Sequence, residues 1–204
     1  TYSYLSSRLQ KLLLTPSSLY VWSKLEENAQ KNSISSVFEL MNTWWQQIQQ
    51  KCISVGLQFE TVISCKDRIV GLMESRGIFS LPRVIFVDQA KEIDILVSLG
   101  LLNSNSNAKS ISFTHQSFLD YFITSDILEK IYLGYELKDL IGDRNSQTPL
   151  IRYRLLTVLQ NLLESDPDSF AKQSVALLQT SDVRFYFNCA VFEVISQCLS
   201  LIHI

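Results

Sequence analysis

Apolar side chains recur every three or four positions through most of the chain, which is the spacing of one face of an α-helix. The pattern is clearest after Ser36, where the apolar positions are Val37, Leu40, Met41, Trp44, Trp45 and Ile48. Ser36 and Glu39 have the S-x-x-E spacing of a capping box, in which the two residues satisfy free backbone N–H groups at a helix start. The segment therefore predicts an amphipathic helix that begins at Ser36.

Two shorter helices are expected before this one. Tyr2–Leu13 has the pattern of a short amphipathic helix. Thr15 followed by Pro16 is a favourable pair for the N-cap and first residue of a second helix, since proline lacks only an N–H that would stay unpaired there. Residues 1–54 therefore predict a small helical domain.

The middle of the chain, residues 55–130, combines helical and strand-like segments. Helices are expected at Phe59–Glu74 and Asp88–Leu99, and the sequence SLPRVIFVD between them is extended or turn-like. The runs LLN and ISF flank the polar loop Ser104–Ser110, which predicts a β-hairpin. A further helix follows Thr114. Helix, helix, hairpin, helix is the order of a winged-helix unit.

Helical periodicity returns in residues 131–204. Thr148–Pro149 and Asp166–Pro167 each pair an N-cap with a proline, and they predict helices at Leu150–Glu164 and Asp168–Leu178. A last helix covers VRFYFNCAVFEVISQCL. Short polar joints between broad apolar faces predict antiparallel helical hairpins of HEAT-like shape, although no exact repeat period is present. The chain as a whole predicts a mainly α protein: a helical bundle, a winged-helix unit with a small β-hairpin, and antiparallel helical hairpins.

The composition supports the prediction of a mainly α protein and limits the classes of binding partner that are expected. Only 6 Gly and 4 Pro occur in 204 residues, as expected of a helical chain. The net charge is −2 and no cluster of Lys and Arg is present, which disfavours nucleic acid as a partner. Apolar runs fall far short of the roughly 20 residues of a membrane span. The four cysteines lie far apart without a C-x-x-C pair and are interpreted as buried, reduced thiols of a cytoplasmic protein.

Motifs for independent catalysis are missing from the sequence. There is no G-x-x-x-x-G-K-[ST] phosphate loop, no G-x-S-x-G, no H-E-x-x-H and no zinc-type Cys/His spacing. With only two histidines, His115 and His203, a histidine-based metal site is not expected. We therefore expect no catalytic residue and no metal ligand in this chain. It opens on Thr1 and ends on an apolar run, and we interpret it as a fragment of a longer protein.

His115 is the one candidate for ligand chemistry that the residues themselves suggest. Thr114 is a natural N-cap, which would place His115 in the first turn of the following helix. Free N–H groups and a partial positive charge at that position favour contact with a phosphate. The alternative is a polar side chain at a helix start that bonds a nearby carbonyl. Both interpretations stay open on the residues alone.

The stretch FTHQSFLDYF resembles the winged-helix motif F-x-H-x-S-F-x-E-Y-F of the NACHT branch of STAND NTPases. The matching residues are Phe113, His115, Ser117, Phe118, Tyr121 and Phe122. Asp120 stands where glutamate is usual. The resemblance implies that His115 reaches the β-phosphate of bound ADP and holds a closed, resting state.

A second segment, LLLTPSSLYVW, resembles the L-x-x-P-L-x-L segment of the small helical domain in the same family. The resemblance implies that Pro16 packs against the adenine, although Ser17 replaces the usual large apolar residue. It further implies an upstream P-loop nucleotide-binding domain, ADP or ATP bound by the whole protein but not tightly by this chain, and a protein partner or self-oligomer. The parent would be a cytoplasmic signalling ATPase of prokaryotic antiphage defence.

Two other functions compete with this one. A non-enzymatic scaffold for protein–protein interaction is supported by Trp44 and Trp45, which we expect cannot both face one core. Either one of them lies exposed or at a domain interface, or Trp45 flanks the edge of the core, and both interpretations stay open on the residues alone. A winged-helix DNA binder is disfavoured because the expected helix Asp88–Leu99 has Lys91 as its only basic residue.

Overall fold

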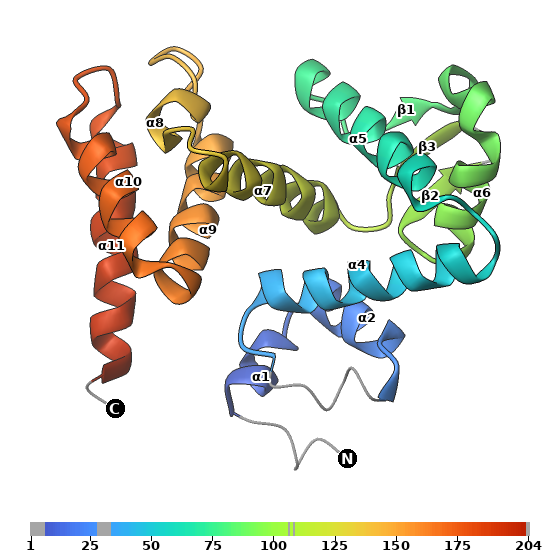
Figure 1. Ribbon diagram of the computed structural model, residues 1–204, viewed down its shortest axis with the longest axis horizontal. Coiled ribbons are helices and arrows are strands. Elements are labelled where there is room, and N and C mark those ends of the chain that lie inside the picture. Colours follow the sequence, from blue (N-terminus) through green and yellow to red (C-terminus); the bar gives the residue numbers. More distant parts are fainter. Residues whose placement is uncertain (1–6, 28–33, 106, 108, 203–204) are drawn as a thin grey trace. The chain divides into compact units, whose positions relative to one another are not determined.

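The computed structural model describes residues 7–27, 34–105, 107 and 109–202, and these are mainly helical with one small antiparallel sheet (Figure 1). The mainly α class predicted from the sequence is confirmed. In chain order the elements are α1 Ser7–Leu12, α2 Pro16–Lys24, α4 Val37–Ser54, α5 Phe59–Arg76, β1 Leu81–Pro82, the 3₁₀ segment η2 Arg83–Gln89, α6 Ala90–Ser98, β2 Leu102–Asn105, β3 Ser110–Phe113, α7 Gln116–Tyr132, α8 Leu137–Leu140, α9 Pro149–Ser165, α10 Pro167–Gln179 and α11 Phe185–Ile202.

The chain divides into two compact units, Thr1–Tyr121 and Phe122–Ile204. The boundary falls inside α7. The sequence predicts three domains, at 1–54, 55–130 and 131–204, and most of the first two lie together in the first unit. The finer division of that unit stays a prediction.

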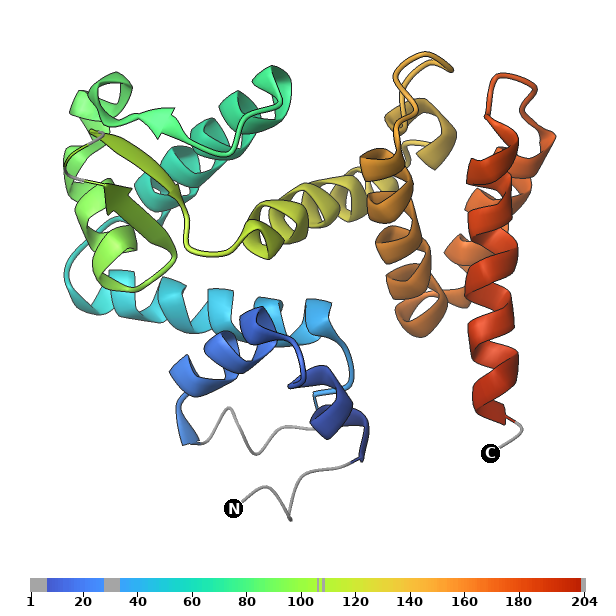
Figure 2. The same cartoon turned by 180° about the vertical axis from the view of Figure 1, so that it is seen from behind.

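Helix starts in the first unit follow local capping. The Thr15 hydroxyl accepts from the Ser18 N–H and Pro16 is the first residue of α2, as predicted. The Ser36 hydroxyl accepts from the Glu39 N–H at 3.1 Å, and α4 begins at the next residue. The Glu39 carboxylate accepts from the Ser35 N–H. In a standard capping box it would accept from the N–H of the cap residue itself, so the second bond of the box uses the residue before Ser36. Figure 2 shows α1 and α2 beside α4. The expected segment Tyr2–Ser6 lies outside the described residues.

The two tryptophans of α4 are both buried, with Trp44 2% and Trp45 8% exposed. The expectation that one of them is exposed was therefore wrong. Neighbouring residues of a helix are only about 100° apart, and the buried positions from Leu40 to Cys52 span an arc of about 140°. Since α4 packs against both α2 and α5, this wide arc is covered. The argument for a scaffold from an exposed tryptophan does not hold.

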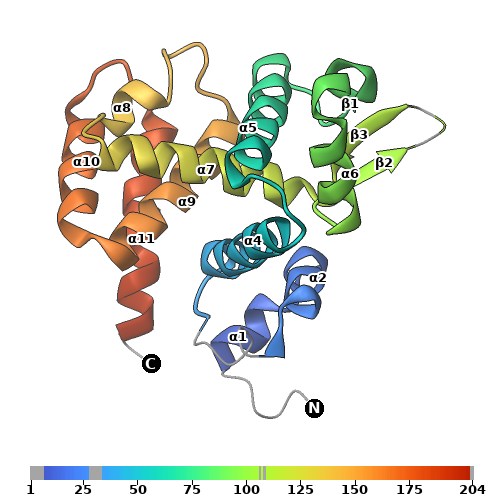
Figure 3. The ribbon, with the colours of Figure 1, turned by 45° about the vertical axis from the view of Figure 1, so that its right-hand side comes forward.

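The sheet is formed by the two strands of the predicted hairpin and by the start of the segment SLPRVIFVD. Strands β2 and β3 pair antiparallel with Leu102 opposite Phe113, and β1 pairs with the other edge of β3 with Leu81 opposite Ile111. The strand order is thus β1-β3-β2 (Figure 3). The segment SLPRVIFVD, expected to be extended or turn-like, forms β1 and η2. Helix α6 begins at Ala90, two residues later than predicted, because the 3₁₀ turn occupies those positions.

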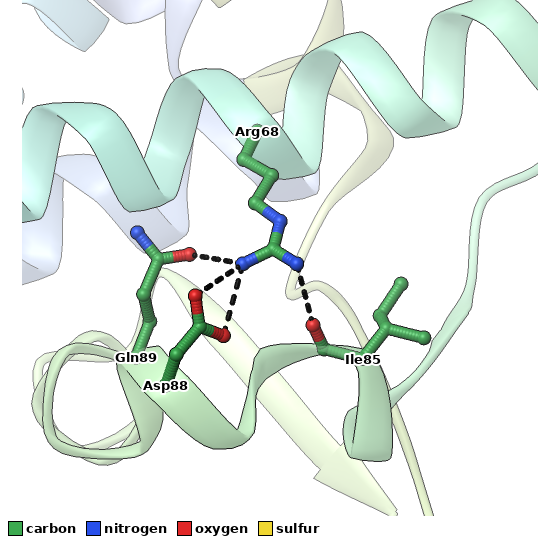
Figure 4. A network of polar contacts seen from close by, with 4 residues as sticks. All are labelled: Arg68, Ile85, Asp88 and Gln89. Atoms are coloured by element: carbon green, nitrogen blue, oxygen red, sulfur yellow. Dashed lines mark hydrogen bonds and ion pairs between the residues drawn. The ribbon is translucent and has the colours of Figure 1, made fainter.

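Arg68 on α5 fixes the 3₁₀ segment in place (Figure 4). Its guanidinium donates to both carboxylate oxygens of Asp88, at 2.8 and 3.0 Å, and to the side-chain oxygen of Gln89 at 3.1 Å. It also donates to the carbonyl of Ile85 at 2.8 Å and lies 5.2 Å from the ring centroid of Phe86. One side chain therefore ties α5 to the turn that connects β1 with α6.

Both predicted proline starts are found in the second unit. Helix α9 begins at Pro149 after the Thr148 cap, and α10 begins at Pro167 after Asp166, whose carboxylate accepts from the Ser169 N–H at 3.0 Å. Helix α9 packs against both α10 and α11. Helix α11 begins at Phe185, later than the sequence suggests.

Two buried glutamines hold the connections of the second unit. The Gln147 amide donates to the carbonyls of Gly142 and Asp182, each at 3.2 Å, and accepts from the Arg184 N–H at 2.8 Å. The Gln173 amide on α10 accepts from the Leu137 N–H at 2.7 Å. Each side chain pairs backbone groups that would otherwise be buried without a partner.

Candidate functional site

His115 lies between the end of β3 and the start of α7. Its carbonyl accepts from the Phe118 N–H at 3.1 Å, so it directly precedes the helix instead of belonging to its first turn. The Thr114 hydroxyl, expected to cap α7, donates to the carbonyl of Gly100 at 2.8 Å. The cap assignment was therefore wrong by one residue, because the threonine joins the end of β3 to the turn that follows α6.

The imidazole of His115 is partly exposed and has aromatic neighbours. It meets the Tyr20 ring edge-on, with 4.9 Å between centroids, and lies 6.0 Å from the Phe118 ring. Among the described residues, no carbonyl accepts a hydrogen bond from the imidazole. The alternative of a histidine that bonds a nearby carbonyl is therefore not realised in this part of the chain, and the ring is neither sealed in aliphatic packing nor fixed by a polar partner.

Tyr20 on α2 contacts the ring of this histidine, and no sequence motif points to it. The Tyr20 hydroxyl donates to the Gly100 carbonyl at 3.0 Å, the same oxygen that Thr114 uses. Burial raises the pKa of the Tyr20 phenol, so that it stays a neutral donor. The only signal in the sequence was spacing: Tyr20 lies four residues after Pro16, one turn further along the same helix face.

Gly100 is required by this arrangement in two ways. Its φ is +81°, in the left-handed region that favours glycine. A Cβ atom at this position would overlap the Tyr20 hydroxyl, and the Tyr20 Cζ would lie 3.6 Å away. From the sequence, Gly100 is expected only as the stop of the helix Asp88–Leu99, whereas in the structure it also accommodates the Tyr20 ring.

Pro16 is exposed at the first position of α2. With a rise of about 1.5 Å per residue, it lies about 6 Å along the helix axis from Tyr20. Tyr20 in turn contacts the His115 ring. The two residues singled out by the sequence are therefore connected through Tyr20 on one side of the first unit.

One cation lies beside the Tyr20 ring of this cluster. The Lys24 ammonium lies 5.4 Å from the centroid of the Tyr20 ring. Neither α2 nor α7 has an acidic residue in its first turn, so the partial positive charge of both helix starts is not neutralised there. These features suit an anionic group close to His115.

The remaining aromatic residues of the motif anchor α7 in the first unit. Phe118 stacks on Trp44 with 4.6 Å between ring centroids. The Tyr121 hydroxyl donates to the Asn42 side-chain oxygen at 3.1 Å, and burial raises the pKa of this phenol. Since both rings are buried, they hold the start of α7 against α4 and keep His115 at the surface.

Thiols and metal ligands do not gather at this site. Cys52 and Cys65 are buried and free, and burial raises the pKa of both thiols, that of Cys65 to about 12. Among the described residues, no group of histidine, cysteine and carboxylate side chains could hold a metal ion. His203 lies outside the described residues.

No helix within the described ranges has the length and apolarity needed to cross a membrane. Comparison with protein-family models, with curated proteins and with solved structures finds no match for the chain.

Proposed function

We propose that this chain is the regulatory part of a NACHT-type STAND signalling ATPase, and that it closes over ADP in the resting state. One observation carries the proposal: the His115 ring stands partly exposed before α7, held edge-on by Tyr20 and without a carbonyl partner among the described residues. Because the ring is partly exposed, its nitrogens can reach solvent, and no carbonyl among the described residues competes for them. Here they remain available for a ligand.

The order of elements in the first unit supports a winged-helix assignment. The sequence α5, β1, η2, α6, β2, β3 has the arrangement helix, strand, two helical segments and a hairpin, and the first strand adds to the far side of the hairpin. In the proposal this unit presents His115, α1 to α4 form the small helical domain that presents Pro16, and α9 to α11 are the HEAT-like arm.

The residues present fit a nucleoside diphosphate. Pro16 offers an exposed apolar face for a base, and His115 lies at the positive start of α7. The distance from one to the other, on the order of 10 Å from the helix rise and the ring contact, can be spanned by one extended ligand. The negatively charged phosphates of ADP would contact these residues and, at the same time, a P-loop nucleotide-binding domain upstream. ADP would in this way hold the two parts together.

Such contacts make a switch because they exist only in the closed state, and a ligand shifts an equilibrium by its difference in affinity for the two states. A hydrogen bond to a charged group contributes about 1.5–3 kcal/mol, which corresponds to roughly 10- to 150-fold in affinity. Loss of the His115 contact would free the chain for self-oligomerisation or partner binding. The proposal, which rests on the family resemblance, assigns the parent protein to prokaryotic antiphage defence in the cytoplasm.

The test compares nucleotide retention in the parent ATPase that the proposal requires. Protein with His115→Ala is purified, denatured and assayed for released ADP by ion-exchange chromatography. We expect at least tenfold less ADP than in the wild type, and activation at a lower dose of the stimulus. Gln116→Ala is the control, since Gln116 is exposed in the adjacent turn. Unchanged ADP content and an unchanged activation threshold would refute the assignment of His115.

The chain by itself gives an independent check. Because the phosphate loop would lie in the upstream domain, we expect ADP to bind this chain only at millimolar concentrations in isothermal titration calorimetry. Micromolar binding would contradict the proposed division between the two parts.

A further inference from the structure

A cavity of about 420 Å³ opens on the first unit, away from the cluster around His115. It lies between η2, the start of α6 and the loop end of the β2–β3 hairpin. Its main apolar residues are Val84, Phe86 and Val87, and its main polar residues are Arg83, Ser104 and Lys109. This volume falls within the range of about 300–1,000 Å³ that is usual for small-molecule sites.

One side of the cavity is apolar. Phe86 is 1% exposed, whereas Val84 and Val87 are each 72% exposed. Arg68 packs against Phe86 and bonds the turn around it, so this side is rigid before any ligand arrives. Covering a valine contributes about 1.5–3 kcal/mol when burial is complete. Two exposed valines next to a fixed aromatic residue therefore favour an apolar group.

The other side is cationic, with one positive charge in excess. The Arg83 guanidinium pairs with Asp94 at 2.5 Å and donates to the Ser104 hydroxyl at 3.2 Å. Lys109 has no carboxylate partner among the described residues. Two cations and one carboxylate leave a net charge of +1.

The backbone presents Lys109 at a fixed position. Its carbonyl accepts from the Arg83 N–H at 2.8 Å, and its φ of +49° is left-handed, which is uncommon for a residue other than glycine. The hairpin thus places a lysine, in a strained conformation, at the mouth of an apolar cavity.

We propose that this cavity binds a small amphipathic monocarboxylate. The carboxylate would pair with Lys109 beside Arg83, and the apolar chain would cover Val84, Phe86 and Val87. A singly charged anion matches the single excess positive charge, whereas a phosphate dianion would bring one negative charge too many. The site does not depend on the nucleotide function proposed above.

The test uses octanoate as the probe and the chain of 204 residues as the sample. Amide shifts in ¹H–¹⁵N NMR spectra are followed below the concentration at which octanoate forms micelles. We expect saturable shifts at residues 84–87 and at Ser104, Asn105 and Lys109. Octan-1-ol, which keeps the apolar chain and removes the charge, is expected to bind about 1.4- to 5-fold more weakly, as the loss of one exposed ion pair implies. Octylamine, which reverses the charge, is expected to bind more weakly still.

Variants separate the two halves of the site. Lys109→Gln keeps the same backbone requirement and should abolish the preference for octanoate over octan-1-ol. Val87→Asn should weaken both ligands, whereas Val175→Asn, at an exposed valine of the second unit, should change neither. Equal binding of octanoate and octylamine, shifts centred outside the cavity, or no saturable shift would each overturn the proposal.

Discussion

Replacing Gly100 by alanine tests the packing that holds His115. The substitution adds one methyl group at a backbone φ of +81° and directs it at the Tyr20 hydroxyl. Two costs are therefore expected, one from the left-handed backbone and one from displacement of the Tyr20 ring.

The two costs are of similar size. A non-glycine residue in the left-handed region loses about 1–2 kcal/mol. Displacing Tyr20 removes its hydrogen bond to the Gly100 carbonyl, about 0.5–1.5 kcal/mol, and disturbs its edge contact with His115, about 0.5–1.5 kcal/mol. The free energy of unfolding of the first unit should fall by about 2–5 kcal/mol.

Gly56 provides a matched control. Its φ is +80°, and nothing lies within 4 Å of a Cβ built there. Gly56→Ala should therefore show the backbone cost alone, with the same gain from a less flexible unfolded chain as Gly100→Ala. The difference between the two variants measures the overlap with Tyr20.

The assay is urea unfolding followed by tryptophan fluorescence. All three tryptophans, Trp22, Trp44 and Trp45, belong to the first unit, so the signal reports on it. In Tyr20→Phe, which lacks the obstructing oxygen, the added cost of Gly100→Ala should fall to that of Gly56→Ala. If Gly100→Ala is no more destabilising than Gly56→Ala, or if Tyr20→Phe does not relieve it, the reasoning about Tyr20 and Gly100 is refuted.

Further outcomes follow from other contacts. Ser36→Ala removes the α4 cap and should lower the stability of the first unit by about 1 kcal/mol, while Ser36→Asp should retain it, as measured by the same urea unfolding. At pH 8 a thiol reagent should leave Cys52 and Cys65 unmodified in native protein and label both in urea, because burial keeps them protonated; labelling within the mixing time of the native protein would contradict this. Hydrogen bonds from the Ser169 hydroxyl and N–H lower the pKa of the Asp166 carboxyl, so the Ser169 amide NMR shift should titrate with a midpoint below about 3.9. The Asp166 carboxylate stabilises the folded protein at pH values above the ordinary aspartate pKa. This contribution to the free energy of unfolding is lost as the pH falls through the lower pKa of the folded protein, and Asp166→Asn should remove this pH dependence.

Features set by neighbouring residues could be predicted from the sequence. The starts of α2, α4, α9 and α10 depend on a cap and a proline or glutamate within a few positions, and all four occur where predicted. The hairpin was found for the same reason, because strand-like runs flank a polar loop. His115 could be singled out because its motif is contiguous, and its role stays a prediction.

Features that depend on residues far apart in the chain could not be predicted from the sequence. Burial of Trp45 depends on the packing of α2 and α5 around α4, which one helix pattern cannot contain. The 3₁₀ segment η2 depends on Arg68, which is 17 positions before its Ile85 partner. Tyr20 and Gly100 have no shared motif, and the glutamines that join loops of the second unit look like ordinary polar residues in the sequence.

The hydrogen bond between Tyr20 and Gly100 joins positions 80 residues apart. Asn42 and Tyr121 are separated by 79. During synthesis the ribosome must therefore release the hairpin region before α2 and α4 can form these contacts with it and with α7. Until then, α2 and α4 are partly formed helices with exposed apolar faces. Chaperone dependence and sensitivity to translation pauses should be concentrated in that interval, before residue 121 has emerged.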